Sequence, residues 1–160
     1  MNGLLGAAWA PILGPLWAGI ATGGFAVLFN LRGKDLPLAA AGGALGWAVA
    51  VPAQAVFGSQ ATGYLVASMA IGIWAELVAA LRRRPASIYI ACGIIPLVPG
   101  GGMYYTMLEY VRGHNMNGLA TAFATLQVAG AIAVGLAVSG AASRLLSLRS
   151  IAGRLGRGQR

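Results

Sequence analysis

Apolar residues fill five long segments of the chain, and short polar segments separate them. The five segments are residues 4–29, 36–57, 63–81, 87–110 and 119–142. Each is long enough to cross a bilayer as a helix, which takes about 20 residues. The pattern predicts an all-α integral membrane protein with one transmembrane domain over residues 1–142. Basic residues recur over 143–160 and predict a basic tail.

The fourth segment carries prolines and glycines at its centre. Pro96 and Pro99 lack backbone N–H groups, and three glycines, residues 100–102, follow directly. We expect a discontinuous helix, with one half over residues 87–95 and a second half from about Met103. Irregular backbone near the middle of a bilayer is tolerated where protein buries it or where it lines a polar cavity. Secondary transporters bind their substrates at such breaks.

The break offers hydrogen-bonding groups without charged side chains. The second half-helix would present free N–H groups around Gly101 to Tyr104 and the positive end of a dipole, which suit a carboxylate. The carbonyls of Cys92 and Ile95 would lose their donors and could accept an ammonium group or a cation. A kink filled by neighbouring side chains is the alternative. We predict a substrate site made of Pro96, Pro99, Gly100, Gly101, Gly102, Tyr104, Tyr105 and Thr106.

Small residues recur at a spacing of four in the first two segments. Gly19 and Gly23 form one G-x-x-x-G motif, and Gly42 and Gly46 form another. Such ridges allow helices to approach closely in lipid. They predict tight packing, within the chain or across an interface.

Composition and charge exclude a soluble domain and set an orientation. Hydrophobic residues make up 58% of the chain and charged residues 9%, with a net charge of +8. Ten of the 11 Lys and Arg residues lie in segments that a five-span chain places on one side, and Arg112 alone lies on the other. The positive-inside rule then predicts an external N-terminus and a cytoplasmic tail. The basic surplus therefore reflects membrane orientation rather than nucleic-acid binding.

The three acidic residues occupy different settings. Asp35 adjoins the basic first loop and is predicted to be a solvated charge. Glu76 lies inside the third segment, where an ionised carboxylate is costly. It is either a proton-coupling group or a side chain that reaches the membrane surface or a basic neighbour. Glu109 is predicted to cap the outer end of the broken helix and to pair with Arg112.

Residues for catalysis or metal binding do not form a recognisable set. His114 is the only histidine and stands in a loop without a ligand cluster. Cys92 is the only cysteine, which excludes an intrachain disulfide. No serine stands in a G-x-S-x-G setting. We predict no metal, no cofactor and no enzymatic activity.

One stretch resembles the signature of the threonine/serine exporter family, in its small-subunit branch: Ala91-Cys-Gly-Ile-Ile-Pro-Leu-Val-Pro-Gly-Gly-Gly-Met-Tyr-Tyr-Thr106. Phe29-Asn30, followed by a basic loop, is similar to the end of that family's first span. A third stretch is similar to the family's segment before the signature: Glu76-Leu-Val-Ala-Ala-Leu-Arg-Arg-Arg-Pro85. The resemblance runs from about Phe25 to Leu136.

In that family, a full-length exporter joins two hydrophobic halves, and split versions make the halves as separate proteins. A related split pair is associated with succinate export. The chain is similar to the second half only. The resemblance therefore implies a partner membrane subunit, a substrate that is threonine, serine or a small dicarboxylate, and residence in the bacterial inner membrane. We expect the proton gradient to drive export, with Glu76 as the proton-coupling candidate. The alternative function is a structural or assembly subunit whose broken helix is only an interface.

Overall fold

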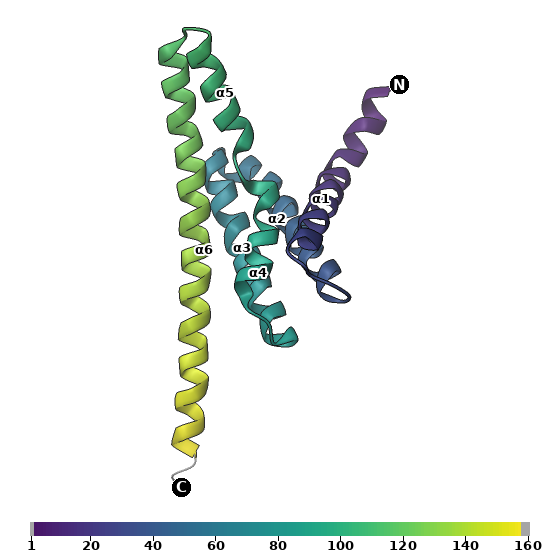
Figure 1. The fold of residues 1–160 in the computed structure, drawn as a ribbon, viewed down its shortest axis with the longest axis vertical. Coiled ribbons are helices and arrows are strands. Elements are labelled where there is room, and N and C mark those ends of the chain that lie inside the picture. Colours follow the sequence, from purple (N-terminus) through teal and green to yellow (C-terminus); the bar gives the residue numbers. More distant parts are fainter. Residues whose placement is uncertain (1, 158–160) are drawn as a thin grey trace.

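The computed structural model describes residues 2–157, and side chains are described for residues 13–145. Helices make up most of the described chain, which contains no strand (Figure 1). Its elements are α1 (Asn2–Leu28), α2 (Asp35–Phe57), α3 (Gln60–Arg82), α4 (Ala86–Gly93), the 3₁₀ turn η1 (Ile95–Leu97), α5 (Gly100–Val111) and α6 (Asn115–Arg157). The all-α fold predicted from the sequence is confirmed.

Helices with the length and apolarity of membrane spans match four of the five predicted segments. They are α2, α3, the part of α6 from Asn115 to Leu145, and the pair Ala86–Leu97 and Gly100–Val111, which bends by 48°. The bent pair confirms a discontinuous fourth helix. α1 has 27 residues, but its side chains are described only from Leu13, and the described part Leu13–Leu28 is apolar. The count of five spans therefore stays a prediction.

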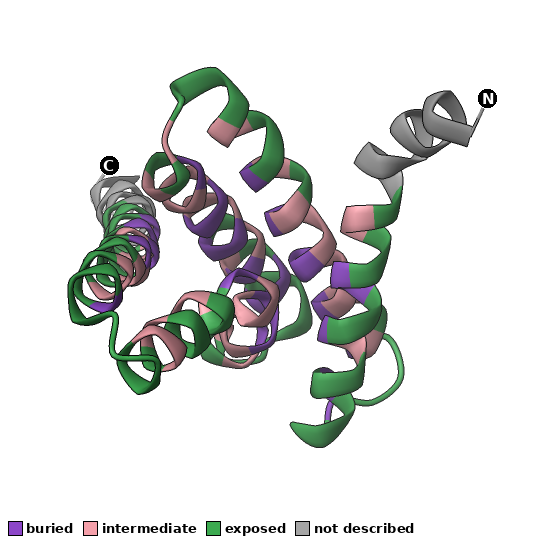
Figure 2. Ribbon diagram, turned by 90° about the horizontal axis from the view of Figure 1, so that it is seen from above, coloured by how far each residue is buried: buried purple, intermediate pink, exposed green. Residues whose placement is uncertain are grey.

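The helices pack in a row around the α2–α3 hairpin. α1 packs against α2, and α6 packs against α3. α4 sits against both hairpin helices, and α5 packs against α6. In Figure 1, α1 and α6 lie on opposite sides, and the tip of the α5–α6 hairpin extends beyond the α2–α3 turn. Figure 2 shows that buried residues gather where the helices face one another, while their outer faces are exposed.

Small residues make the close helix contacts that the sequence predicted, and they make them within the chain. A Cβ on Gly19 would lie 3.3 Å from both the Ala40 carbonyl oxygen and the Ala44 Cβ on α2. Gly46 of α2 lies against Ile71 of α3 in the same way. Close approach of backbones is the packing that small residues allow in lipid.

α3 and α6 contact each other through a reciprocal pair of glycines and serines. Gly72 of α3 lies against the hydroxyl of Ser139, and Gly135 of α6 lies against the hydroxyl of Ser68. Both hydroxyls donate to carbonyls of their own helices, with O···O distances of 2.9 Å. The polar groups are therefore satisfied without any cross-helix hydrogen bond.

Two buried clusters fill the interior at different heights. The basal layer consists of Ala26, Leu31, Ala39, Ala75, Val78, Ala79, Tyr89 and Cys92. The middle layer consists of Ala50, Ala67, Ile71, Leu97, Val128 and Ile132.

Near its C-terminal end, α6 continues to Arg157 as one helix, so the basic tail predicted from residue 143 does not begin at a helix end. Side chains beyond residue 145 lie outside the described residues.

Candidate functional site

The break in the fourth span has a different boundary from the one predicted. α4 ends at Gly93, η1 follows, and α5 begins at Gly100 rather than near Met103. The three glycines therefore form the first turn of α5 instead of the gap. Pro99 precedes that turn as its N-cap residue, with φ −77° and ψ 53°. A proline there limits the backbone before the helix starts.

Of the two carbonyls that were predicted to lose their donors, that of Ile95 accepts a hydrogen bond in the structure. The N–H of Val98 donates to the Ile95 carbonyl at 3.3 Å. The N–H of Ile94 donates to the Ile90 carbonyl at 3.0 Å and also contacts the Cys92 carbonyl. The prediction of a free carbonyl was wrong for Ile95, because the 3₁₀ turn supplies a donor three residues later.

The free N–H groups at the start of α5 belong to two glycines. The N–H of Gly100 donates to Val98 at 2.7 Å, and the N–H of Met103 donates to Pro99 at 3.2 Å. Among the described residues, no carbonyl outside α5 accepts from Gly101 or Gly102. These two N–H groups point along the positive end of the helix dipole, an arrangement that suits an anion.

A cavity of about 390 Å³ lies beside this first turn of α5. Its size falls within the range of roughly 300–1,000 Å³ that is typical of ligand sites. Four parts of the fold enclose it: α2, α3, the break with the start of α5, and α6. The lining residues are Trp47, Gln60, Tyr64, Pro96, Val98, Pro99, Gly101, Gly102, Thr121, Ala124, Thr125 and Val128.

The structure brings half of the predicted site residues to this cavity. Pro96, Pro99, Gly101 and Gly102 line it, while Gly100 does not. Tyr104 and Tyr105 are 62% and 58% exposed and contact each other edge to face, outside the cavity. The hydroxyl of Thr106 donates to the Gly102 carbonyl at 2.8 Å, and its side chain lines a separate apolar groove between α5 and α6.

Polar cavity residues from α3 and α6 are absent from the predicted site. Gln60 and Tyr64 are four residues apart on α3, and Thr121 and Thr125 are four residues apart on α6. Each pair shares a helix face, and this spacing is the signal that could have identified them. The two threonine hydroxyls donate to Asn117 and Thr121 carbonyls, at 2.9 and 2.7 Å. Their oxygens remain available as acceptors.

Two other grooves, one larger and one smaller than this cavity, are almost entirely apolar. A groove of about 460 Å³ between α1 and α2 is lined by glycines, alanines, prolines, leucines and an isoleucine. The α5–α6 groove, about 300 Å³, is lined mainly by Met103, Met107, Leu126 and alanines. Apolar surfaces of this kind suit lipid or another helix. Of these three sites in the described part of the chain, the cavity at the break is the one that combines apolar walls with several polar groups, as small-molecule sites do.

Glu76 lies away from the cavity. It follows Gly72 by one turn on the α3 face that meets α6, and it is partly buried. It comes twelve residues after Tyr64 on α3, or about 18 Å along the helix axis. Its role in proton coupling stays a prediction.

Asp35 is buried, and the prediction that it is a solvated charge was wrong. It is 1% exposed, and its carboxylate accepts from three side chains. Arg82 Nε lies 2.6 Å from Oδ1, and Arg84 Nε lies 2.9 Å from Oδ2. The Tyr89 hydroxyl donates to Oδ1 at 3.0 Å. We call these four residues the Asp35 network.

A left-handed residue brings the two arginines of the network together. Arg83 has φ 54° and ends α3, and both its N–H and that of Arg84 donate to the Ala79 carbonyl. This type of helix ending reverses the chain direction. Arg82 and Arg84 therefore approach the same carboxylate, while Arg83 remains exposed.

Glu109 pairs with His114 rather than with Arg112. The Nδ1 atom of His114 lies 3.0 Å from the Glu109 carboxylate, across the turn between α5 and α6. The predicted pairing was wrong because the turn after Val111 directs His114 back toward α5. Within the described part of the chain, no three His, Cys, Asp or Glu side chains form a group that could hold a metal.

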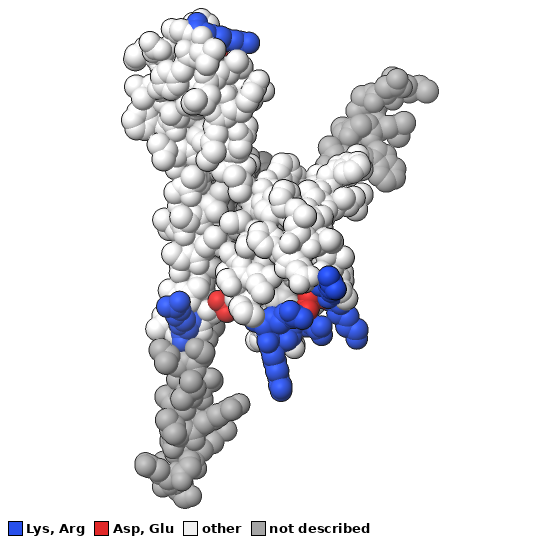
Figure 3. Space-filling view, in the orientation of Figure 1, with Lys and Arg blue, Asp and Glu red and all other residues white. Residues whose placement is uncertain are grey.

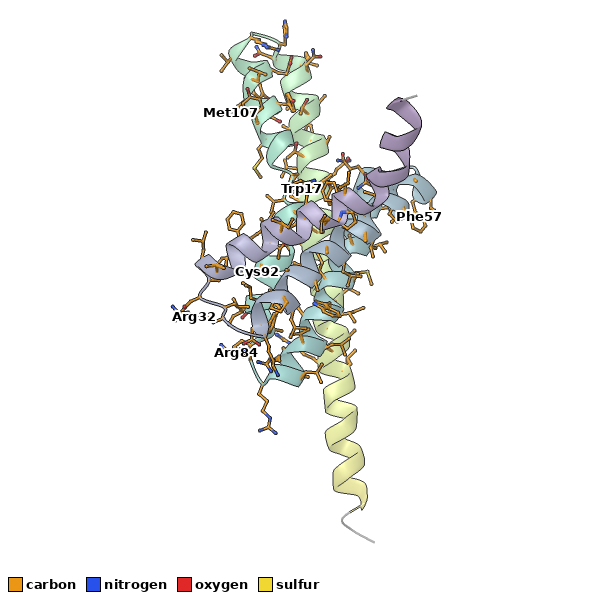
Figure 4. The ribbon with its side chains drawn as sticks, turned by 90° about the vertical axis from the view of Figure 1, so that its right-hand side faces the viewer. Trp17, Arg32, Phe57, Arg84, Cys92 and Met107 are labelled. Carbon is orange, nitrogen blue, oxygen red and sulfur yellow. The ribbon has the colours of Figure 1, made fainter. Side chains whose placement is uncertain are left out.

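Charged side chains mark the two ends of the molecule. Figure 3 shows Lys and Arg side chains gathered at one end, beside the lower ends of α2 and α3, and one basic group at the opposite tip of the α5–α6 hairpin. Figure 4 places Arg32 and Arg84 toward the first end and Met107 toward the second, with Cys92 between them. We call the first the basic end.

The comparison with known protein families supports the assignment of the chain as a membrane transporter. The family described as Threonine/Serine exporter, ThrE, matches residues 15–142. No curated protein and no solved structure gives a match. The matched region includes the whole cavity, the break and the Asp35 network. The chain belongs to the threonine/serine exporter family.

Proposed function

We propose that the chain is a membrane subunit of a secondary exporter for threonine, serine or a related small carboxylate, and that the cavity at the break holds the substrate. One observation carries this proposal: the polar cavity adjoins the first turn of α5, where Gly101 and Gly102 have free N–H groups. A substrate carboxylate placed there would accept those hydrogen bonds and interact with the helix dipole.

The rest of the cavity suits the other polar groups of an amino acid. Gln60 and Tyr64 line the cavity from α3, and Thr121 and Thr125 line it from α6. These groups can accept hydrogen bonds from an ammonium or a hydroxyl. No acidic or basic side chain lines the cavity. A substrate without net charge therefore fits better than a dicarboxylate, whose second negative charge would lack a partner.

A second membrane subunit would complete the site. Among the described elements, α6 is the only helix against which α5 packs extensively, and no residue of α5 is buried. The faces of α5 that α6 leaves exposed, next to the cavity, are where a helix of the second subunit would pack. The partner that we propose carries the other half of the exporter. Both subunits lie in the bacterial inner membrane, with the N-terminus of this chain outside and its C-terminus in the cytoplasm.

Proton movement would drive export, and Glu76 is the proposed coupling group. Among the described side chains, Glu76 is the carboxylate within a span for which no ion pair is found. A carboxylate in a span is often part of a proton pathway. Its distance from the cavity means that coupling would act through movement of α3 against α6.

Co-reconstitution of both subunits in proteoliposomes tests the substrate site. Efflux of serine is compared with efflux of serine amide, which keeps the shape but lacks the negative charge. Loss of the dipole interaction and of charge-assisted hydrogen bonds costs about 2–3 kcal/mol, or roughly 30- to 150-fold in affinity. Equal affinities would contradict the proposed carboxylate site.

A structural or assembly role is the second candidate. It is favoured by the exposed apolar side chains of α5, which include Met103, Met107 and Val111. Such a subunit would bind its partner but would not contact the substrate. Substitutions that fill the cavity would then leave efflux unchanged, whereas the proposed exporter role predicts that they stop it.

A further inference from the structure

The cavity and the Asp35 network lie at opposite ends of one buried column. Along α3, the cavity residue Tyr64 is followed by Ala67 and Ile71 of the middle layer, then by Ala75 of the basal layer, and finally by Arg82. Arg82 comes eighteen residues after Tyr64, or about 27 Å along the helix. The network therefore stands at the basic end of the path that leads to the cavity.

The other two helices of the column show the same order. From the basic end, α2 contributes Asp35 to the network, Ala39 to the basal layer and Trp47 to the cavity. The broken span contributes Tyr89 to both the network and the basal layer, and Leu97 to the middle layer. Its Pro99 then lines the cavity. In this structure, both layers and the network separate the cavity from the basic end.

We propose that the Asp35 network is the gate that closes the substrate cavity toward the basic, cytoplasmic end and that opens once in each transport cycle. An exporter must take up its substrate from the cytoplasm, and the buried column blocks that route here. The proposal rests on the proposed function, because a gate is needed only if the cavity holds a substrate. It adds to that function a named set of gate residues and a conformational state, with the cytoplasmic side closed.

The chemistry of the network allows it to open. The side chains of Arg82 and Arg84 are 36% and 52% exposed, so water can replace Asp35 as their partner at small cost. Asp35 and Tyr89 are buried and depend on the network for their hydrogen bonds. The closed state is therefore stabilised by contacts that hydration can replace once the helices separate.

α4 is the element that can move away from α2 and α3. It is one short helix, Ala86–Gly93, between the turn after Arg84 and the 3₁₀ turn at the break. Tyr89 is its link to the network, and the break bends the span by 48°. A rotation of α4 about the break would withdraw Tyr89 from Asp35 and disturb the cavity lining at Pro96 and Pro99. The same hinge would couple the gate to the substrate site.

Cys92 provides a native reporter of this movement. It is the only cysteine in the chain, and it lies on α4 three residues after Tyr89, fully buried in the basal layer. A thiol reagent applied from the basic end can reach Cys92 only when the network and the basal layer open. The rate of labelling therefore measures the population of the open gate.

The test uses inverted membrane vesicles that contain the full chain with its partner subunit, and a membrane-impermeant methanethiosulfonate reagent. Asp35→Asn is expected to raise the labelling rate of Cys92 by about tenfold or more, because removal of the charge releases both arginines. Tyr89→Phe removes one hydrogen bond and keeps the ring, so a smaller increase of about fivefold is expected. Arg83→Gln removes an arginine outside the network and should label like the wild type.

Three results decide the proposal. Faster labelling of Asp35→Asn and Tyr89→Phe from the cytoplasmic face, with unchanged labelling from the external face, supports the gate. Wild-type rates in both variants would overturn it, and so would equal increases from both faces, which indicate general loosening. If Asp35→Asn fails to insert, Tyr89→Phe and Arg84→Gln decide alone. The proposed function fails separately, if serine is neither bound nor transported while the variants still label faster.

Discussion

Gly102 of α5 lies directly against Thr125 of α6, at the wall of the cavity. A Cβ on Gly102 would meet the Thr125 side chain, with Cγ2 at 3.1 Å and Cβ at 3.2 Å. Gly101, one residue earlier, has no atom within 4 Å of its Cβ position. The two glycines therefore serve different needs, close helix packing at Gly102 and open space in the cavity at Gly101.

Gly102→Ala is expected to destabilise the protein by about 1–3 kcal/mol, because the added methyl group overpacks the α5–α6 contact. Thr125→Ala should relieve this clash, so the double variant should be more stable than Gly102→Ala alone. Gly101→Ala serves as the matched control and should be close to neutral. Thermal unfolding in detergent micelles measures the stability of Gly102→Ala, Gly101→Ala, the double variant and the wild type. Equal destabilisation by both alanines would contradict the different roles of the two glycines.

The α3–α6 contact gives a second stability prediction. A Cβ on Gly135 would lie 2.6 Å from the Leu65 carbonyl oxygen, which cannot move aside as a side chain can. Gly135→Ala should therefore force the helices apart, at a cost of about 1–3 kcal/mol. Gly130 of the same helix has open space around its Cβ position, so Gly130→Ala should not destabilise. A Gly135→Ala protein with wild-type thermal stability would show that the helices do not pack this closely.

Membrane orientation can be tested with single cysteines in a Cys92→Ala background. Ser59 precedes α3 and Asn115 begins α6, and both positions are predicted to be external. Arg83, at the exposed turn before α4, is predicted to be cytoplasmic. A membrane-impermeant thiol reagent added to intact cells should label cysteines at Ser59 and Asn115 but not at Arg83. Labelling of the Arg83 position from outside would reverse the orientation, and the proposed side of the gate with it.

The need for a partner predicts that this chain does not export by itself. Among the described elements, α5 packs mainly against α6, so a lone chain leaves the other faces of α5, next to the cavity, without a protein neighbour. Proteoliposomes with this chain alone should show efflux no faster than protein-free liposomes, and addition of the partner should restore transport. Robust efflux from the purified chain would contradict a partner-dependent site.

The broken span was predictable because its cause is local. Two prolines and three glycines interrupt a helix wherever they stand, so the discontinuity followed from residues 96–102 alone. The exact register of the break was not predictable from the sequence. The 3₁₀ turn that supplies a new donor to the Ile95 carbonyl depends on how Leu97 is buried in the middle layer. The glycine ridges of the first two helices were also predictable from the sequence, because small residues at a spacing of four share one helix face.

Partners that lie far apart in sequence were not predictable from the pattern. Asp35 is next to basic residues in the chain, which favoured a solvated charge, but its partners Arg82 and Tyr89 follow 47 and 54 residues later. The cavity walls on α3 and α6 were missed for the same reason. The spacing of four places Gln60 with Tyr64, and Thr121 with Thr125, on one helix face, but it does not indicate which helix that face meets until the packing is known.

The most direct test of the substrate site compares two neighbouring glycines. Gly100 and Gly101 both have open space around their Cβ positions, but only Gly101 lines the cavity. Gly101→Val would fill the space beside the free N–H groups, whereas Gly100→Val would leave the cavity unchanged. Pro99→Ala would test the break itself, because Pro99 lines the cavity and precedes α5.

The measurement is efflux of labelled serine from proteoliposomes that contain both subunits, with insertion of each variant checked beforehand. The cavity site predicts that Gly101→Val abolishes efflux, that Pro99→Ala reduces it, and that Gly100→Val retains it. Wild-type efflux from an inserted Gly101→Val protein would contradict the account and place the substrate elsewhere.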